Sequence, residues 1–173
     1  MENDSNEGDD TGPLLVFCMV NEQVIASIRQ LTEELLSLDP GYFLVEVRIK
    51  PTNNVKVFVD GDKGVPVEKL VQLNRALYAQ LEAAGLFPDN NFSLEVSSPG
   101  LDEPLKLHRQ YLKNIGRKVE TTLLDGTVKE GTLLAVTDTQ ITLEETLGKK
   151  KDQKKQTDIL FTEIKHTIVC IVF

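Results

Sequence analysis

His108 is the first residue whose type and neighbours could support catalysis. It follows Asp102 and Glu103 by six and five positions, and a histidine with a carboxylate can transfer protons in acid–base catalysis. A solvated position on a short polar helix over residues 106–114 explains the same histidine without any chemistry. The sequence has no Gly-x-Ser-x-Gly elbow, no phosphate loop ending in Gly-Lys-Ser/Thr and no dinucleotide fingerprint. We therefore expect no catalytic residue and a protein that is not an enzyme.

Metal-binding residues are few and widely spaced. The chain has two cysteines, Cys18 and Cys170, and two histidines, His108 and His166. No two of them stand at a C-x-x-C or H-x-x-x-H spacing, which a zinc site of the usual kind needs. Both cysteines lie in apolar runs, where a free thiol behaves as a small apolar side chain. We expect reduced cysteines, no metal and no cofactor.

Gly61-Asp62-Lys63-Gly64 matches the Gly-x-x-Gly loop with which KH domains hold a nucleic-acid backbone. In those domains the loop joins two helices, whereas here it follows a predicted strand. A turn between a strand and a helix explains the two glycines without a ligand, and both interpretations remain open.

A lysine cluster lies on a predicted loop between two strands. Ammonium groups that contact phosphates release counterions and give a salt-dependent affinity. A solubilising hairpin tip is the alternative, because Asp152 interrupts the cluster and acidic residues flank it. The candidate RNA contacts are Lys149, Lys150, Lys151, Lys154 and Lys155.

Charge is distributed unevenly along the 173 residues. The formal net charge of −8 argues against nonspecific binding of the whole molecule to nucleic acid or to an anionic membrane. Residues 1–98 carry seven basic and 16 acidic residues, whereas residues 99–173 carry 12 basic and 11 acidic ones. The second half is therefore the better candidate for an anionic partner. The longest apolar run has seven residues (14–20), too few to span a membrane, and we expect a cytoplasmic protein.

Apolar periodicity predicts an α+β fold in two modules. Residues 1–20 form an expected acidic, mobile tail. In residues 21–98 the spacing predicts a helix from Asn21, two strands that form a hairpin, a second helix and a third strand. Residues 99–173 show only short strands separated by turns, which predicts a small antiparallel barrel.

The junction between the modules is rich in turn-forming residues. Proline fixes one backbone angle and glycine permits a reversal that a side chain hinders. A short, semi-rigid connector is expected here, either for domain packing alone or for direct contact with a partner. Its residues are Ser97, Ser98, Pro99, Gly100, Leu101 and Asp102.

The dodecapeptide at residues 94–105, Leu-Glu-Val-Ser-Ser-Pro-Gly-Leu-Asp-Glu-Pro-Leu, closely resembles the junction signature of the ribosome maturation factor RimP family. Tyr111, Gly116, Val119, Asp125-Gly126 and Gly131 follow at the spacing of that family, and residues 42–47 and 57–60 resemble its first two strands. The resemblance covers roughly residues 21–173. At Glu103 the sequence departs from it, because that position is commonly basic in the family.

The resemblance implies a KH-like N-terminal domain, an Sm-like (SH3-like) C-terminal barrel and a non-enzymatic role in maturation of the small ribosomal subunit. The expected partner is that subunit or its precursor, through ribosomal protein, ribosomal RNA or both, and the expected state is a monomer with no membrane contact. The alternative is a stand-alone Sm-like or KH-like RNA-binding adaptor without a ribosomal role.

Overall fold

The computed structural model describes residues 13–147 and 153–171. The chain is an α+β protein, as predicted. It begins with α1 (Pro13–Leu36), β1 (Tyr42–Lys50), β2 (Asn54–Gly61), α2 (Val67–Ala84), a single 3₁₀ turn η1 (Pro88–Asn90) and β3 (Ser93–Ser97). The order of helix, strand, strand, helix and strand is the KH-like order expected from the sequence.

Helix α1 begins at Pro13, eight residues before the expected start at Asn21. Residues 13–20, assigned to the tail by sequence, are therefore helical. Proline is favoured in the first turn of a helix, where its missing N–H costs no hydrogen bond, and the apolar run that follows continues the helix. Residues 1–12, the rest of the predicted tail, lie outside the described residues.

The three N-terminal strands form one sheet in the order β1-β2-β3. Strand β1 pairs antiparallel with β2, whereas β3 pairs parallel with β2, so that α2 serves as the crossover that a parallel pair requires. Val55, Val57 and Val59 alternate along β2 and are fully buried. Three leucines of α2 complete this core at Leu73, Leu77 and Leu81.

The second half contains α3 (His108–Lys113), β4 (Lys118–Leu123), β5 (Val128–Val136), β6 (Gln140–Thr146), β7 (Lys154–Leu160), the 3₁₀ turn η2 (Phe161–Glu163) and β8 (Ile164–Val169). The five strands form an antiparallel sheet in the order β7-β6-β5-β4-β8. A separate core fills it, with Val119, Leu133, Ile141 and Leu143 fully buried.

The five strands agree with the sequence, but the predicted closure into a barrel is corrected. Among the described residues β7 pairs only with β6 and β8 only with β4, so the sheet remains open between these two edges. Strands β7 and β8 follow each other through η2 but lie at opposite edges and do not pair with each other. The spacing of short strands in the sequence predicts a sheet, but it does not encode whether the two edges of that sheet pair.

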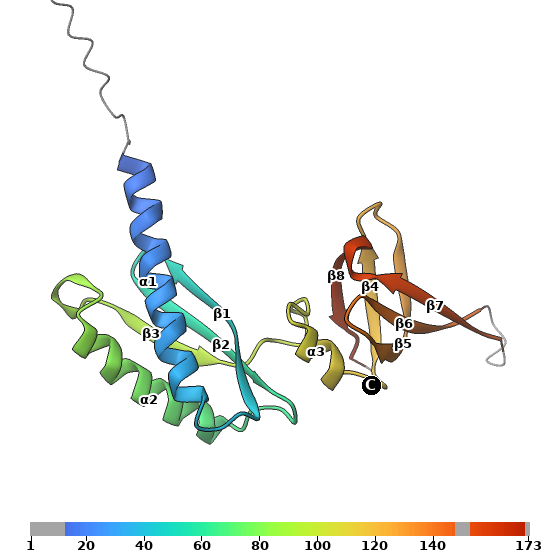
Figure 1. Ribbon diagram of the computed structural model, residues 1–173, viewed down its shortest axis with the longest axis horizontal. Coiled ribbons are helices and arrows are strands. Elements are labelled where there is room, and N and C mark those ends of the chain that lie inside the picture. The colour runs from blue at the N-terminus through green and yellow to red at the C-terminus, as the bar shows by residue number, and fades with distance from the viewer. Residues whose placement is uncertain (1–12, 148–152, 172–173) are drawn as a thin grey trace, which may run out of the picture.

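The connecting segment and α3 lie between the two sheets (Figure 1). The Leu105 N–H donates to the carbonyl of Thr167 in β8 at 2.8 Å, which fastens the end of the connector to the C-terminal sheet. No helix among the described residues is both long enough and apolar enough to cross a membrane.

Candidate functional site

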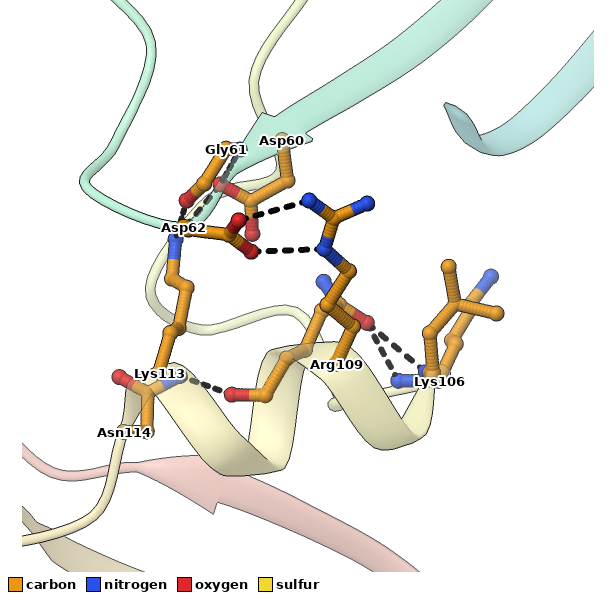
Figure 2. Close-up of polar contacts among 9 residues, drawn as sticks. Asp60, Gly61, Asp62, Lys106, Arg109, Lys113 and Asn114 are labelled. Atoms are coloured by element: carbon orange, nitrogen blue, oxygen red, sulfur yellow. Dashed lines mark hydrogen bonds and ion pairs between the residues drawn. The ribbon is translucent and has the colours of Figure 1, made fainter. Parts of the chain in front are cut away.

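An ionic clasp, defined as Asp60, Asp62, Arg109 and Lys113, joins α3 to the N-terminal sheet (Figure 2). Arg109 donates from Nε and Nη2 to the two carboxylate oxygens of Asp62, at 2.7 and 2.6 Å. Lys113 Nζ donates to Asp60 Oδ1 at 2.5 Å. Arg109 and Lys113 are four residues apart and therefore lie on the same face of α3. The clasp thus uses one helix face against the end of one strand.

Buried amides hold α3 in place, although it has only six residues. Gln110 Oε1 accepts from the backbone N–H groups of Lys106 and Leu107 at 2.8 and 3.0 Å. Asn114 Nδ2 donates to the carbonyl of Gln110 at 2.8 Å. These bonds pair polar groups at both ends of a helix that is too short to be stable alone. They hold α3 so that Arg109 and Lys113 face the N-terminal sheet.

Arg109 makes two further contacts across the interface. It donates to the carbonyl of Pro40 at 2.5 Å, and its guanidinium lies 4.6 Å from the centre of the Phe43 ring. The hydrogen bonds from Arg109 lower the pKa of Asp62 below its ordinary value. Asp62 is therefore held as a carboxylate, and the clasp is a charged contact at neutral pH.

A second ionic group lies beside the clasp. Glu46 of β1 pairs with Lys106 and with Arg48, the latter at 2.6 Å. Burial raises the pKa of Glu46, but the hydrogen bonds from Arg48 and Lys106 outweigh burial and leave that pKa lowered. Arg48 also reaches Glu103 of the connector at 3.3 Å. Glu103 is thus engaged within the chain. Its acidic side chain does not provide the phosphate contact that a basic residue at this position could make.

The Gly-x-x-Gly segment is part of this interface. Asp62 belongs to the clasp, Gly64 has a φ of +85°, and a Cβ on Gly61 would lie only 2.6 Å from the carbonyl oxygen of Gly64. Both glycines are required by the turn itself. This geometry favours the interpretation as a turn between strand and helix over a nucleic-acid loop.

A groove of about 580 Å³ opens on the C-terminal half beside α3. We name it the α3–β8 groove. Its walls are apolar, with four basic or imidazole side chains and one carboxylate around them. The lining residues are Pro104, Leu105, Lys106, His108, Tyr111, Asp138, Phe161, Ile164, Lys165 and His166.

Both histidines of the chain line this groove, although no spacing in the sequence connects them. His108 Nε2 lies 2.9 Å from the carbonyl oxygen of Thr137. The rings of His108 and Tyr111 lie 6.0 and 5.2 Å from that of Phe161, and burial raises the pKa of Tyr111. These rings form the apolar floor of the groove. The described contacts of His108 are therefore structural, with a backbone carbonyl and an aromatic ring.

The lysine cluster falls partly outside the described residues, which exclude Lys149, Lys150 and Lys151. Lys154 and Lys155 are exposed at the start of β7, opposite Thr146 and Glu145 of β6. Lys154 Nζ pairs with Glu144 at 2.8 Å, and this hydrogen bond raises the pKa of Lys154. One of the candidate RNA contacts is therefore partly neutralised within the chain.

Comparisons with known proteins identify the family of this chain. A family profile described as the RimP N-terminal domain matches residues 31–102. The ribosome maturation factor RimP of Flavobacterium psychrophilum is 33% identical over 153 residues, which cover 84% of this chain and 96% of that protein. The chain belongs to the RimP family. Proteins of the same name from Christiangramia forsetii and Cytophaga hutchinsonii are 31% and 34% identical over 84% and 75% of this chain, and over 97% and 80% of their own lengths.

The RimP junction signature has a defined place in the structure. Ser97 ends β3, and Ser98, Pro99, Gly100 and Leu101 line a cleft of about 160 Å³ between the two halves of the chain. The side chain of Asp102 takes the space beside Gly100, where a Cβ would lie 2.8 Å from Asp102 Oδ1. Leu101 remains half exposed. The signature thus packs against both halves, and Leu101 is the apolar residue in it that is most open to a partner.

The clasp was missed by sequence reasoning in this RimP-family chain. Its signals are present as an Asp-x-Asp at the end of a strand and an Arg-x-x-x-Lys on a short helix. Neither pattern names its partner, because the paired groups lie 47 to 53 positions apart. Only the fold brings them together.

Proposed function

We propose that this chain is a ribosome maturation factor that binds the small ribosomal subunit or its precursor, in the cytoplasm and as a monomer, without catalysing a reaction. One observation carries the proposal: a relative named ribosome maturation factor RimP aligns over 84% of this chain and 96% of its own length. An alignment of that length spans most of both cores. The proposal therefore concerns the whole chain rather than one module.

Binding rather than catalysis is supported by how the reactive groups are used. The cations of α3, Arg109 and Lys113, are engaged by Asp62 and Asp60, and Lys106, just before α3, is engaged by Glu46. His108 contacts a backbone carbonyl and an aromatic ring. Groups engaged in this way hold the elements of the chain together and are not free to act on a substrate.

Two surfaces of the C-terminal half are candidates for the ribosomal contact. The α3–β8 groove, with apolar walls and basic side chains at its rim, suits a segment of a ribosomal protein. The lysine cluster suits RNA phosphates. The described lysines of the cluster, Lys154 and Lys155, and Phe161 of the groove lie at opposite ends of β7, which spans roughly 20 Å at about 3.3 Å per residue. Their contributions can therefore be measured separately.

Sedimentation with purified small subunits tests the proposal. The full chain should sediment with the subunit or its precursor, and Lys165→Glu at the rim of the groove should weaken this association. Lys50→Glu makes the same charge change at an exposed position of the N-terminal sheet and serves as the control. If the wild-type chain fails to sediment with small subunits and with their precursors, the ribosomal role is wrong and the RNA-binding adaptor becomes the better hypothesis.

A further inference from the structure

The outer edge of β3 is open to an additional strand. Among the described strands, β3 pairs only with β2. The Ser93 N–H donates to the carbonyl of Asn53, and in a parallel pair the N–H groups of alternate residues point to opposite sides. Leu94 and Val96 therefore direct their N–H groups away from β2. Unpaired edges of this kind are templates for strand addition.

Asn74 of α2 occupies this edge. Its side-chain Oδ1 accepts the Val96 N–H at 3.2 Å. A side-chain amide thus takes the place that the backbone carbonyl of a neighbouring strand would fill. An incoming strand can replace this bond with an equivalent one, so the Val96 N–H is satisfied in the free chain and remains available to a ligand.

A groove of about 390 Å³ runs between α2 and this edge. Val67, Leu70 and Val71 form its helical wall, and residues 94–98 form the other. Val67 is 70% exposed and Val71 is 43% exposed. Exposed valines of this kind, in line on a helix that faces an open edge, provide a place for one apolar side chain of a ligand.

The charges beside the groove favour a carboxylate. Arg75 lines the groove and is exposed, and within the described ranges it makes no ion pair. The acidic residue of the strand, Glu95, is already paired with Lys56 at 3.0 Å. An unpaired guanidinium at the rim complements a carboxylate in the ligand.

We propose that the groove between α2 and β3 docks an extended peptide segment of a partner protein, which adds to β3 as a fourth strand. The peptide places an apolar side chain against Val67 and Val71 and a carboxylate against Arg75. Main-chain hydrogen bonds to an edge strand, with a pocket for alternate side chains, are an established mode of peptide recognition. The inference does not rest on the proposed ribosomal function.

Two other occupants fit the groove less well. Residues 1–98 carry 16 acidic and seven basic residues, which disfavours the polyanionic backbone of RNA. A second copy pairing antiparallel through β3 would place Glu95 opposite Glu95, because this residue is the centre of the strand Ser93–Ser97. Like charges directly opposite each other destabilise a strand pair.

Selection from a displayed library of random twelve-residue peptides, with the full chain as bait, tests the proposal. The strongest selected peptide is synthesised and titrated into the isotopically labelled full chain. We expect the amide resonances of Leu94 and Val96 to shift, and Val71→Glu to weaken binding at least tenfold. Gln72→Glu makes the same charge change at the next exposed position, outside the groove, and should leave the affinity unchanged. Arg75→Glu should remove any preference for acidic peptides.

Matching melting temperatures of the two glutamate variants show that both are folded. The proposal is overturned if the library yields no binder, if the selected peptides shift resonances elsewhere, or if Val71→Glu and Gln72→Glu bind alike. A ten-residue oligouridylate that shifts the β3 amides in place of any peptide would assign the groove to RNA. A concentration-dependent dimer that Val71→Glu abolishes would assign it to a second copy.

Discussion

Arg109 and Lys113 reach acidic residues that lie 47 to 53 positions away in the chain. The side chains of Arg109 and Asp62 are 40% and 48% exposed, and ion pairs so exposed contribute little to global stability because water screens them. A two-point arginine–carboxylate contact that also lies on an aromatic ring is nevertheless geometrically specific. We therefore expect the clasp to affect the orientation of the two halves more than the stability of either.

Removing the cations of the clasp should uncouple the two halves. In the double variant Arg109→Gln and Lys113→Gln we expect both cores to remain folded, because neither side chain lies in a core cluster. The two halves should tumble more independently, with shorter rotational correlation times from nitrogen relaxation. Lys118→Gln is the control, since Lys118 pairs with Glu130 inside the C-terminal sheet. Unchanged tumbling in the double variant would show that the connector alone fixes the orientation.

Acid should open the same interface. Hydrogen bonds from Arg109 lower the pKa of Asp62 below 3.8, and those from Arg48 and Lys106 lower that of Glu46 below 4.5. A carboxylate with a lowered pKa stabilises the folded arrangement fully above its unfolded pKa, and this stabilisation is lost as the pH falls through the lowered value. Coupling of the halves should therefore persist above about pH 5 and weaken below about pH 4.

Nitrogen relaxation measured from neutral to acid pH checks this dependence. The double variant Asp62→Asn and Glu46→Gln should be weakly coupled at every pH and lose the acid transition. A transition that persists unchanged in that variant would assign it to other carboxylates.

The elements differ in how far the sequence could predict them. Strand β2 alternates Val55, Val57 and Val59 with polar residues, and its position was predicted because burial of one face imposes that period. Helix α1 was predicted from Asn21 because that residue is a good N-cap, yet the helix begins at Pro13. A cap signal marks where a helix can begin but does not prevent an earlier start.

No local pattern in the sequence shows whether the C-terminal sheet is open or closed. Five strands at regular spacing fit a barrel as well as an open sheet. The difference lies in whether the two edge strands pair, and no spacing in the sequence shows that. The candidate site also depends on the fold. His108 and His166 both line the α3–β8 groove, although no spacing in the sequence connects them.

The two cores should respond separately to mutation. Leu77 is 1% exposed in the core of the N-terminal half and Leu133 is fully buried in that of the C-terminal half. Leu→Ala in a packed core costs roughly 2 to 5 kcal/mol. Leu77→Ala should therefore lower amide-exchange protection mainly within residues 21–98, and Leu133→Ala mainly within residues 99–173.

Amide hydrogen exchange of both variants thus tests the proposed division into two modules. Val71→Ala, at an exposed position of α2, controls for the loss of a side chain from a helix without a cavity. Equal loss of protection throughout the chain in both leucine variants would mean that the two halves unfold as one cooperative unit.

At the scale of the whole molecule, the proposed ribosomal role requires an acidic chain to approach an RNA-rich particle. A net charge of −8 opposes association with RNA at long range. The acidic excess lies in residues 1–98, so that the molecule is electrically asymmetric along its sequence. Such asymmetry orients an approaching molecule, with the C-terminal half and its lysines toward phosphates. Salt should therefore affect association through that half.

The lysine cluster gives this argument a quantitative test. Replacing Lys149, Lys150, Lys151, Lys154 and Lys155 with Gln should weaken association with small subunits most strongly at low salt. Each phosphate contact removed should flatten the slope of log affinity against log salt by about 0.7 to 0.9. Lys154 should account for less of this change than the average, because Glu144 already pairs with it at 2.8 Å. The melting temperature should change little, because the two described lysines are exposed and lie outside the core cluster.

Lys50→Gln and Lys63→Gln on the N-terminal half are the controls. If the five-lysine variant keeps the wild-type affinity and slope, the cluster is a solubilising hairpin and the α3–β8 groove must carry the recognition through protein contacts.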